Sequence, residues 1–144
     1  VRALDDNSQD VREKAAFALG LLSTGEVIDP LLQALRDPDA QVREKAAIGL
    51  AIRRSAKTVD ALIEAAHDSD SQVREKVVMA LGTSGDQRAA AVLTRALNDS
   101  DSQVREKAVL GLRLLNSSQP SDETAEGVRG GLRGLVRGLL NLTR

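Results

Sequence analysis

Residues 68–82 read DSDSQVREKVVMALG, and the word VREK within this stretch occurs four times in the chain. The copies begin at Val11, Val42, Val73 and Val104, each 31 residues after the one before, without insertion or deletion. A fixed period of this size indicates a stack of small units, each made of one supersecondary structure. The period by itself therefore indicates a repeat fold.

Aligning the four copies on the Val of VREK shows which positions of the unit are shared. Eight positions after the Val, every unit has a leucine: Leu19, Leu50, Leu81 and Leu112. Eight positions before it, every unit has an alanine: Ala3, Ala34, Ala65 and Ala96. Seven positions after it, the residue is always small: Ala18, Gly49, Ala80 and Gly111. These columns predict apolar helix faces and, at the small column, a close approach of neighbouring helices.

Each unit is predicted to contain two helices. The second begins after an N-cap three residues before the Val, and all four candidates are good capping residues: Ser8, Asp39, Asp70 and Asp101. Gly20 and Gly82 stand where a C-terminal glycine would stop this helix. The first helix carries apolar residues at helical spacing, such as Leu31 and Leu35, and a short connection makes the two helices antiparallel neighbours.

One such hairpin cannot bury its apolar face alone, but stacking it on a neighbour does so. We therefore expect an all-α solenoid over residues 1–116, with a truncated first helix at residues 1–5 followed by about four second helices. A polar linker at residues 117–122 leads to an amphipathic C-terminal helix, rich in Gly and Arg, at residues 123–144.

The pattern of residues 68–82 resembles HEAT repeats, in the short, regular subtype of phycobilisome lyases and of artificial helical-repeat binders. The resemblance implies a right-handed α-α superhelix with the second helices on its concave side. In that family an Asp and an Arg form a ladder along the stack, because a guanidinium can bridge carboxylates and carbonyls of neighbouring units. Here the resemblance implies these ladder residues: Asp6, Arg12, Asp37, Arg43, Asp68, Arg74, Asp99 and Arg105.

The Glu and Lys of VREK point, by the geometry of that family, from the concave face toward solvent. At a helix spacing of ~10 Å they form two neighbouring columns. The columns contain Glu13, Glu44, Glu75 and Glu106, and Lys14, Lys45, Lys76 and Lys107. Two interpretations stay open: a solvated, mutually neutralising ladder worth little per pair, or a charged rim for a partner.

An apolar row accompanies these charges. Three residues beyond each Lys stand Phe17, Ile48, Met79 and Leu110, and four residues further stand Leu21, Ile52, Thr83 and Leu114. If the row faces the groove, it is an apolar strip of the kind that marks interaction sites, and it holds the chain's only Phe and only Met. The alternative is that neighbouring repeats cover the row as core. We hypothesise that the strip and its charged rim bind a protein or peptide.

The C-terminal segment has a pitch of four. Its apolar, basic and glycine columns are Val128, Leu132, Val136 and Leu140; Arg129, Arg133 and Arg137; and Gly130, Gly134 and Gly138. Each glycine costs up to about 1 kcal/mol in an isolated helix, so we expect a helix only where something packs on the segment. Ser121 or Asp122 is the candidate cap. The segment then caps the last repeat, docks in a neighbouring chain, lies on an anionic membrane through Arg133 and Arg137, or stays disordered.

Composition limits the chemistry further. A net charge of −1 gives no reason to expect a nucleic-acid partner, and no apolar run is long enough to span a bilayer. The absence of cysteine excludes thiol catalysis and thiolate metal sites and leaves the redox compartment undetermined. The location is thus unknown from the sequence, with the cytoplasm favoured over secretion. The chain begins at Val1 without a Met or a signal pattern, so we expect a piece of a longer polypeptide.

No catalytic constellation is evident. His67 is the only histidine, whereas iron-dependent HEAT enzymes carry His-Glu pairs. No Cys, Tyr or Trp is present to hold a chromophore, as the resemblance to phycobilin lyases would require. We therefore expect a non-catalytic scaffold without a cofactor. Two alternatives remain: an accessory or regulatory domain of a larger enzyme, such as a membrane-bound metallopeptidase, and a designed or consensus repeat scaffold, which would explain the identical charged residues.

Overall fold

The computed structural model describes residues 2–22 and 25–117, and all regular secondary structure within these ranges is helical. Two short 3-10 turns lie at Arg2–Asp5 and Gly25–Val27. The α-helices are α1 (Gln9–Leu21), α2 (Ile28–Ala34), α3 (Ala40–Ala51), α4 (Ala56–Ala65), α5 (Ser71–Thr83), α6 (Ala89–Ala96) and α7 (Ser102–Ser117). Ser117, expected in the linker, still belongs to α7, and the predicted C-terminal helix at 123–144 lies outside the described residues.

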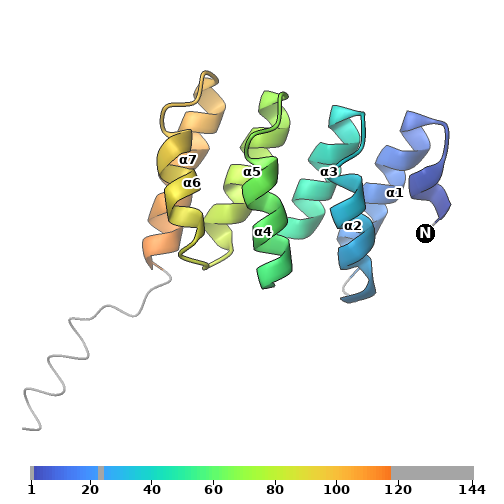
Figure 1. Ribbon diagram of the computed structural model, residues 1–144, viewed down its shortest axis with the longest axis horizontal. Helices are drawn as coiled ribbons and strands as arrows, with labels where there is room; N and C mark the ends of the chain where they lie inside the picture. Colours follow the sequence, from blue (N-terminus) through green and yellow to red (C-terminus); the bar gives the residue numbers. More distant parts are fainter. Residues whose placement is uncertain (1, 23–24, 118–144) are drawn as a thin grey trace, which may run out of the picture.

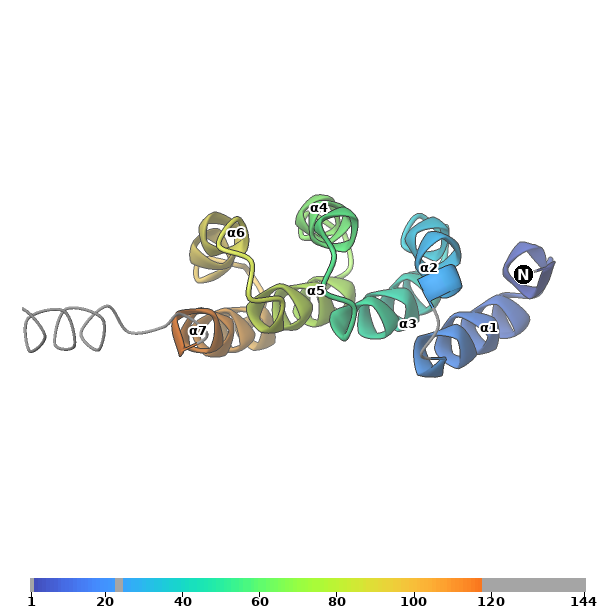
Figure 2. The same ribbon diagram turned by 90° about the horizontal axis from the view of Figure 1, so that it is seen from below.

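The helices form two rows (Figures 1 and 2). The second helices of the units, α1, α3, α5 and α7, form a continuous row, while α2, α4 and α6 stand apart from one another in the other row. The second helices pack more closely together than the first helices do. The stack therefore curves, and the row of second helices lies on its inner side. The predicted all-α solenoid of antiparallel hairpins is confirmed. Among the described helices, none is long and apolar enough to cross a membrane.

The core lies between the two rows. The Val and Leu columns of the second helices are fully buried in the middle of the stack, as Val42, Val73, Leu50 and Leu81 show. The first helices contribute the side chains that meet them: Leu31, Leu62 and Leu93. A unit therefore buries its apolar face against both its own partner helix and the next unit, as the repeat argument requires.

Glycine has a different role from the one the sequence suggested. Gly20 and Gly82 lie inside α1 and α5, so the prediction that they stop these helices is wrong. Each instead faces a glycine of the next second helix, Gly49 for Gly20 and Gly111 for Gly82. A Cβ atom on Gly82 would lie only 2.3 Å from the Cα atom of Gly111. The small residues are there because two backbones approach each other directly.

The second helices begin at the expected caps, but the caps are not equal. The Asp70 carboxylate accepts hydrogen bonds from the amides of Gln72 and Val73, at 2.9 and 3.1 Å. Asp39 and Asp101 cap α3 and α7 in the same way. Ser8 precedes α1 with the right backbone conformation, yet its hydroxyl makes no cap bond.

Replacing the cap of α5 should therefore cost more than replacing the cap of α1. Asp70→Ala leaves two amides of the first turn without an acceptor and should lower the free energy of unfolding by about 1 kcal/mol. Ser8→Ala removes no hydrogen bond and should change it by less than about 0.5 kcal/mol. Urea unfolding of the two variants checks this, and equal losses would show that the Asp70 bonds contribute nothing.

Candidate functional site

The predicted apolar strip faces solvent, most openly over α1 and α3. The exposed fraction is 50% for Phe17, 70% for Leu21, 40% for Ile48 and 72% for Ile52. The remaining predicted strip residues divide by exposure into exposed Leu110 and the half-buried side chains of Met79, Thr83 and Leu114. The strip is thus widest at the N-terminal half of the stack and narrows over α5. Leu22, which the sequence analysis left out, is half exposed directly after α1 and extends it.

The strip stays continuous from α1 to α3 because these helices touch through Gly20 and Gly49. Phe17 and Leu21 lie on α1 one turn apart, and Ile48 and Ile52 occupy the same unit positions at the end of α3. None of the four belongs to the buried core, which is formed by the opposite sides of both helices. The geometry therefore presents four large apolar side chains together on one rigid support.

The charged columns beside the strip neutralise each other. Lys45 lies between two glutamates, with its Nζ atom 3.7 Å from Glu13 and 3.9 Å from Glu44. Lys76 pairs with Glu75 at 3.2 Å, and Lys107 with Glu106 at 3.6 Å. Lys14 is exposed at the N-terminal end of the column. Partly exposed pairs of this kind stabilise the fold little, so the columns frame the strip without giving it a strong net charge.

The ladder residues join each unit to the next. Arg43 Nη1 donates to the carbonyl oxygens of Asp37 and Pro38 in its own loop, at 2.9 and 3.1 Å. Its Nε and Nη2 atoms donate to both carboxylate oxygens of Asp68 in the following unit, at 2.7 and 2.9 Å. Arg12 binds Asp37, and Arg74 binds Asp99, in the same bidentate manner. Each Arg therefore pairs with the Asp 25 residues ahead of it.

At the two ends of the ladder the pattern is incomplete. Asp6 accepts from the amide of Ser8 at 2.8 Å, and it precedes the first Arg of the ladder. Arg105 donates to the carbonyls of Asp99 and Ser100, at 2.7 and 3.0 Å, as its counterparts do in their own loops. Within residues 2–22 and 25–117, no carboxylate accepts a hydrogen bond from the other N–H groups of the Arg105 guanidinium. The described ladder thus consists of three complete rungs.

Both partners of a rung have shifted pKa values. Burial raises the pKa of Asp68, but the hydrogen bonds from Arg43 and the Asp70 amide outweigh burial, so its pKa lies below the usual value. Arg74 is the main cause of the lowered pKa of Asp99. The carboxylate of Asp99 in turn raises the pKa of Arg74. The rungs are therefore fully charged at neutral pH, where their attraction is greatest.

Arg53 is a structural residue that the sequence analysis missed. Its guanidinium donates to the carbonyl oxygens of Leu19 at 3.2 Å and of Leu22, and to that of Gly49 in the helix α3 that Arg53 follows. Burial lowers its pKa. Arg53 satisfies carbonyls at the C-terminal end of α1 from the next unit, and so ties Leu19 and Leu22 to that unit. The matching positions in the other three units hold Leu22, Ser84 and Leu115, so the repeat gave no signal for it.

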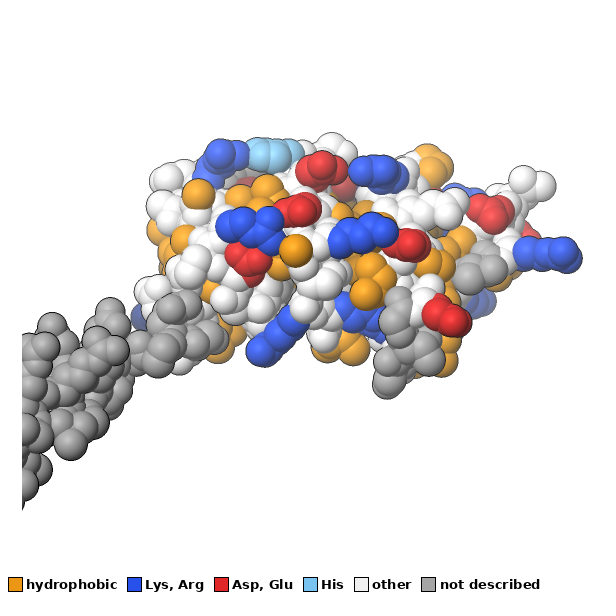
Figure 3. Space-filling view, turned by 60° about the horizontal axis from the view of Figure 1, so that its bottom comes forward, with side chains coloured by type: hydrophobic (Ala, Val, Ile, Leu, Met, Phe, Trp, Pro, Cys, Tyr) orange, Lys and Arg blue, Asp and Glu red, His pale blue; other side chains and the backbone are white. Residues whose placement is uncertain are grey.

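The outer row carries a second set of contacts that the sequence analysis did not predict. Side chains 28 residues apart meet between neighbouring first helices: Arg36 with Glu64 at 3.5 Å, Lys57 with Asp29, and Arg88 with Asp60. His67 Nε2 lies 3.0 Å from Arg95 Nη1 with the same separation. Figure 3 shows positive and negative side chains alternating along this side, with hydrophobic side chains between them.

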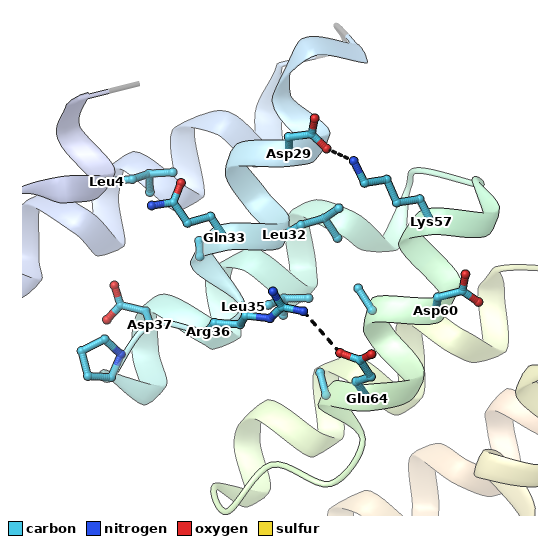
Figure 4. A pocket seen from close by; sticks show the side chains of 14 residues that line it. Leu4, Asp29, Leu32, Gln33, Leu35, Arg36, Asp37, Lys57, Asp60 and Glu64 are labelled. Atoms are coloured by element: carbon cyan, nitrogen blue, oxygen red, sulfur yellow. Dashed lines mark hydrogen bonds and ion pairs between the residues drawn. The ribbon is translucent and has the colours of Figure 1, made fainter.

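A groove of about 820 Å³ lies between α2 and α4 on this outer side (Figure 4). Leu32 and Leu35 line it, and the ion pairs Asp29–Lys57 and Arg36–Glu64 cross it from one helix to the other. These bridges close part of the groove and balance its charge. Among the described residues, no group of three or more His, Asp or Glu side chains is placed to hold a metal ion. The exposed large apolar side chains Phe17, Leu21, Ile48 and Ile52 lie on the inner strip and not in this groove.

Comparison with known proteins agrees with this architecture. The family described as HEAT repeats matches residues 1–75 and again residues 28–113. The structure of human deoxyhypusine hydroxylase in complex with glycerol is similar, with a TM-score of 0.70 and 25% identity over 81% of this chain and 42% of that chain. An engineered protein has a TM-score of 0.62 at 23% identity over 81% of this chain and 61% of its own.

The matches cover only part of the two known structures. The chain spans less than half of the hydroxylase and about three fifths of the engineered protein, and the likeness to the engineered protein concerns the fold alone. No curated protein sequence matches the chain significantly.

Proposed function

We propose that this chain, which belongs to the HEAT-repeat family, is a non-catalytic scaffold that binds a protein or peptide on the inner face of its second helices. The observation that carries the proposal is the joined exposure of Phe17, Leu21, Ile48 and Ile52 on two helices that touch. Large exposed apolar patches with a polar border are typical of interaction sites. The patch is held by packed helices, so binding requires little ordering of the scaffold.

The charge of the site indicates what kind of partner fits it. Lys45 is already paired with Glu13 and Glu44, and Lys76 with Glu75. A partner would therefore gain its affinity from apolar area rather than from net charge. We infer a segment that presents apolar side chains at helical spacing, and an affinity that changes little between low and moderate salt because long-range charge attraction contributes little.

A second candidate is an accessory domain of a larger enzyme. The similarity to less than half of the hydroxylase chain favours it. In that case the same strip would hold another part of the same polypeptide. If the side chains of Phe17 and Ile48 are shielded from solvent in a longer form of the polypeptide, this candidate is favoured over binding to a separate partner.

Peptide selection tests the scaffold. Binders selected from a random displayed library on the wild-type chain should lose at least about tenfold in affinity for the double variant Phe17→Ser and Ile48→Ser, because apolar anchors dominate interfaces of this kind. The matched control removes an exposed pair on the outer side, Arg36→Ser with Glu64→Ser, and should keep the affinity. Circular dichroism should show unchanged helicity for both variants. Binders that are indifferent to the strip variant would contradict the proposal.

A further inference from the structure

The outward side of α7, which faces away from α5, is more exposed to solvent than the corresponding side of any earlier second helix. Val109 has an exposed fraction of 43%, whereas Val78, at the same position of the preceding unit, is 1% exposed. Leu112 is only partly buried, although Leu50 and Leu81 in its column are fully buried. In the earlier units the following unit covers these positions. An apolar surface of this kind at the end of a repeat stack normally needs a cap.

The residues after α7 repeat the pattern that leads from α3 into α4. Four residues, 52–55, connect α3 to α4, and four residues, 118–121, separate α7 from Asp122. Ser55 is the N-cap of α4, with its hydroxyl accepting from the Thr58 amide at 3.1 Å. The buried side chains that follow are Thr58, Val59 and Leu62. The chain has Ser121, Thr124, Ala125 and Val128 at the same spacing.

The charges at this end favour the same arrangement. The acids of the segment are Asp122, Glu123 and Glu126, and no acid follows them up to residue 144. A helix that turns back over α7 would place these acids beside its last turns, where Arg113 is exposed. Opposite charges would therefore meet where the new helix begins, and acids in a first turn also suit the helix dipole.

Arg113 also argues against another second helix at this place. It occupies the unit position that holds Gly20, Ala51 and Gly82 in α1, α3 and α5. Gly20 and Gly82 at this position meet Gly49 and Gly111 of the next second helix, with their backbones in contact. A neighbour cannot approach α7 as closely past an arginine side chain. The row of second helices is thus adapted to end at α7.

We propose that residues 122–131, with Ser121 as their N-cap, form one more first helix, which packs on the outward side of α7, covers Val109 and Leu112, and caps the stack. The occupant of this surface is the chain's own C-terminal segment rather than a second copy. Docking there keeps the segment out of the inner strip and leaves Phe17 and Ile48 available to a partner.

Thiol labelling of the full chain tests the proposal, because the wild type has no cysteine. Val109→Cys and Leu110→Cys place a thiol on neighbouring residues with nearly equal exposed fractions, 43% and 40%. The proposal places only the first under the cap. We expect maleimide to react about tenfold more slowly with the Val109→Cys variant, as for a site that is covered about nine tenths of the time.

A second substitution identifies what covers the thiol. Adding Val128→Asp to Val109→Cys should restore the faster rate, because an aspartate at the position of buried Leu62 opposes packing. Adding Gly130→Asp, at the position of exposed Glu64, should leave the protection in place. Equal rates for the Val109→Cys and Leu110→Cys variants would overturn the proposal. Protection that persists with Val128→Asp, or that is lost equally with Gly130→Asp, would also overturn it. Protection that depends on protein concentration would indicate a second copy and would overturn it as well.

Discussion

Replacing Gly82 with alanine should lower the free energy of unfolding by about 2 kcal/mol or more, although alanine is the better helix former by about 1 kcal/mol. The new Cβ atom would lie 2.3 Å from the Cα atom of Gly111 and 3.1 Å from its carbonyl carbon and oxygen. These are backbone atoms, so no rotamer change relieves the overlap. Helices α5 and α7 must separate, which exposes part of the core beneath them and costs more than the gain in helix propensity.

Gly20→Ala is the matched control for this prediction. It makes the same change at the same unit position, but the added Cβ atom would lie 3.0 Å from the Cα atom of Gly49. A shift of a few tenths of an ångström relieves that contact, so helix propensity and crowding should nearly cancel. Guanidinium unfolding should rank the proteins as wild type, then Gly20→Ala close to it, then Gly82→Ala well below. Equal stability of the two variants would mean that the α5–α7 contact is not closer than the α1–α3 contact.

These glycines also show how far the sequence determines the packing. The small column at Gly49 and Gly111 was enough to predict a close approach of helices. Gly20 and Gly82 were misassigned because a glycine near a predicted helix end fits both a C-terminal stop and a contact. The contact involves two different unit positions, two residues short of a full period apart, as in Gly20 with Gly49. An alignment of single columns does not reveal such a relation.

The candidate site was predictable where it depends on the repeat and not where it depends on a single unit. Helical spacing separated Phe17 and Ile48 from the Val and Leu columns but left open whether neighbouring repeats cover them, and the structure shows both side chains exposed. The narrowing of the strip over α5 follows from the local environment of Met79 and Thr83, where the Thr83 hydroxyl donates to the Met79 and Ala80 carbonyls. Arg53 occurs once, so no periodicity could identify its contact with α1.

The outer ion pairs were missed for a related reason. Arg36 and Glu64 are 28 residues apart, three fewer than the period, because neighbouring first helices meet with an offset of about one turn. The ladder differs again: the resemblance gave its residues, while the structure shows that each guanidinium binds the carboxylate of the next unit. That assignment depends on the distance between units, which the sequence does not contain.

Arg74→Ala should destabilise the stack by about 2–3 kcal/mol, whereas Lys76→Ala should cost less than about 0.5 kcal/mol. Arg74 donates to both oxygens of Asp99 and to the carbonyls of Asp68 and Ser69, and removing it leaves these acceptors without their donor. The value is below that of a fully buried pair because both side chains keep 14% exposure. Lys76 forms an ion pair with Glu75 on a partly exposed face. Equal melting temperatures of the two variants would contradict the ladder.

The same pair of proteins should respond differently to acid. The pKa of Asp99 in the folded chain lies below its ordinary value because of Arg74, so the stabilisation is fully present above the unfolded pKa of about 3.9 and is lost as the pH falls through the folded pKa. In Arg74→Ala the main cause of that lowering is absent. The difference in unfolding free energy between wild type and Arg74→Ala should therefore be largest at pH 7 and shrink toward pH 2. A gap that stays constant over this range would mean that Arg74 stabilises the stack through its carbonyl contacts and its packing rather than through the charge of Asp99.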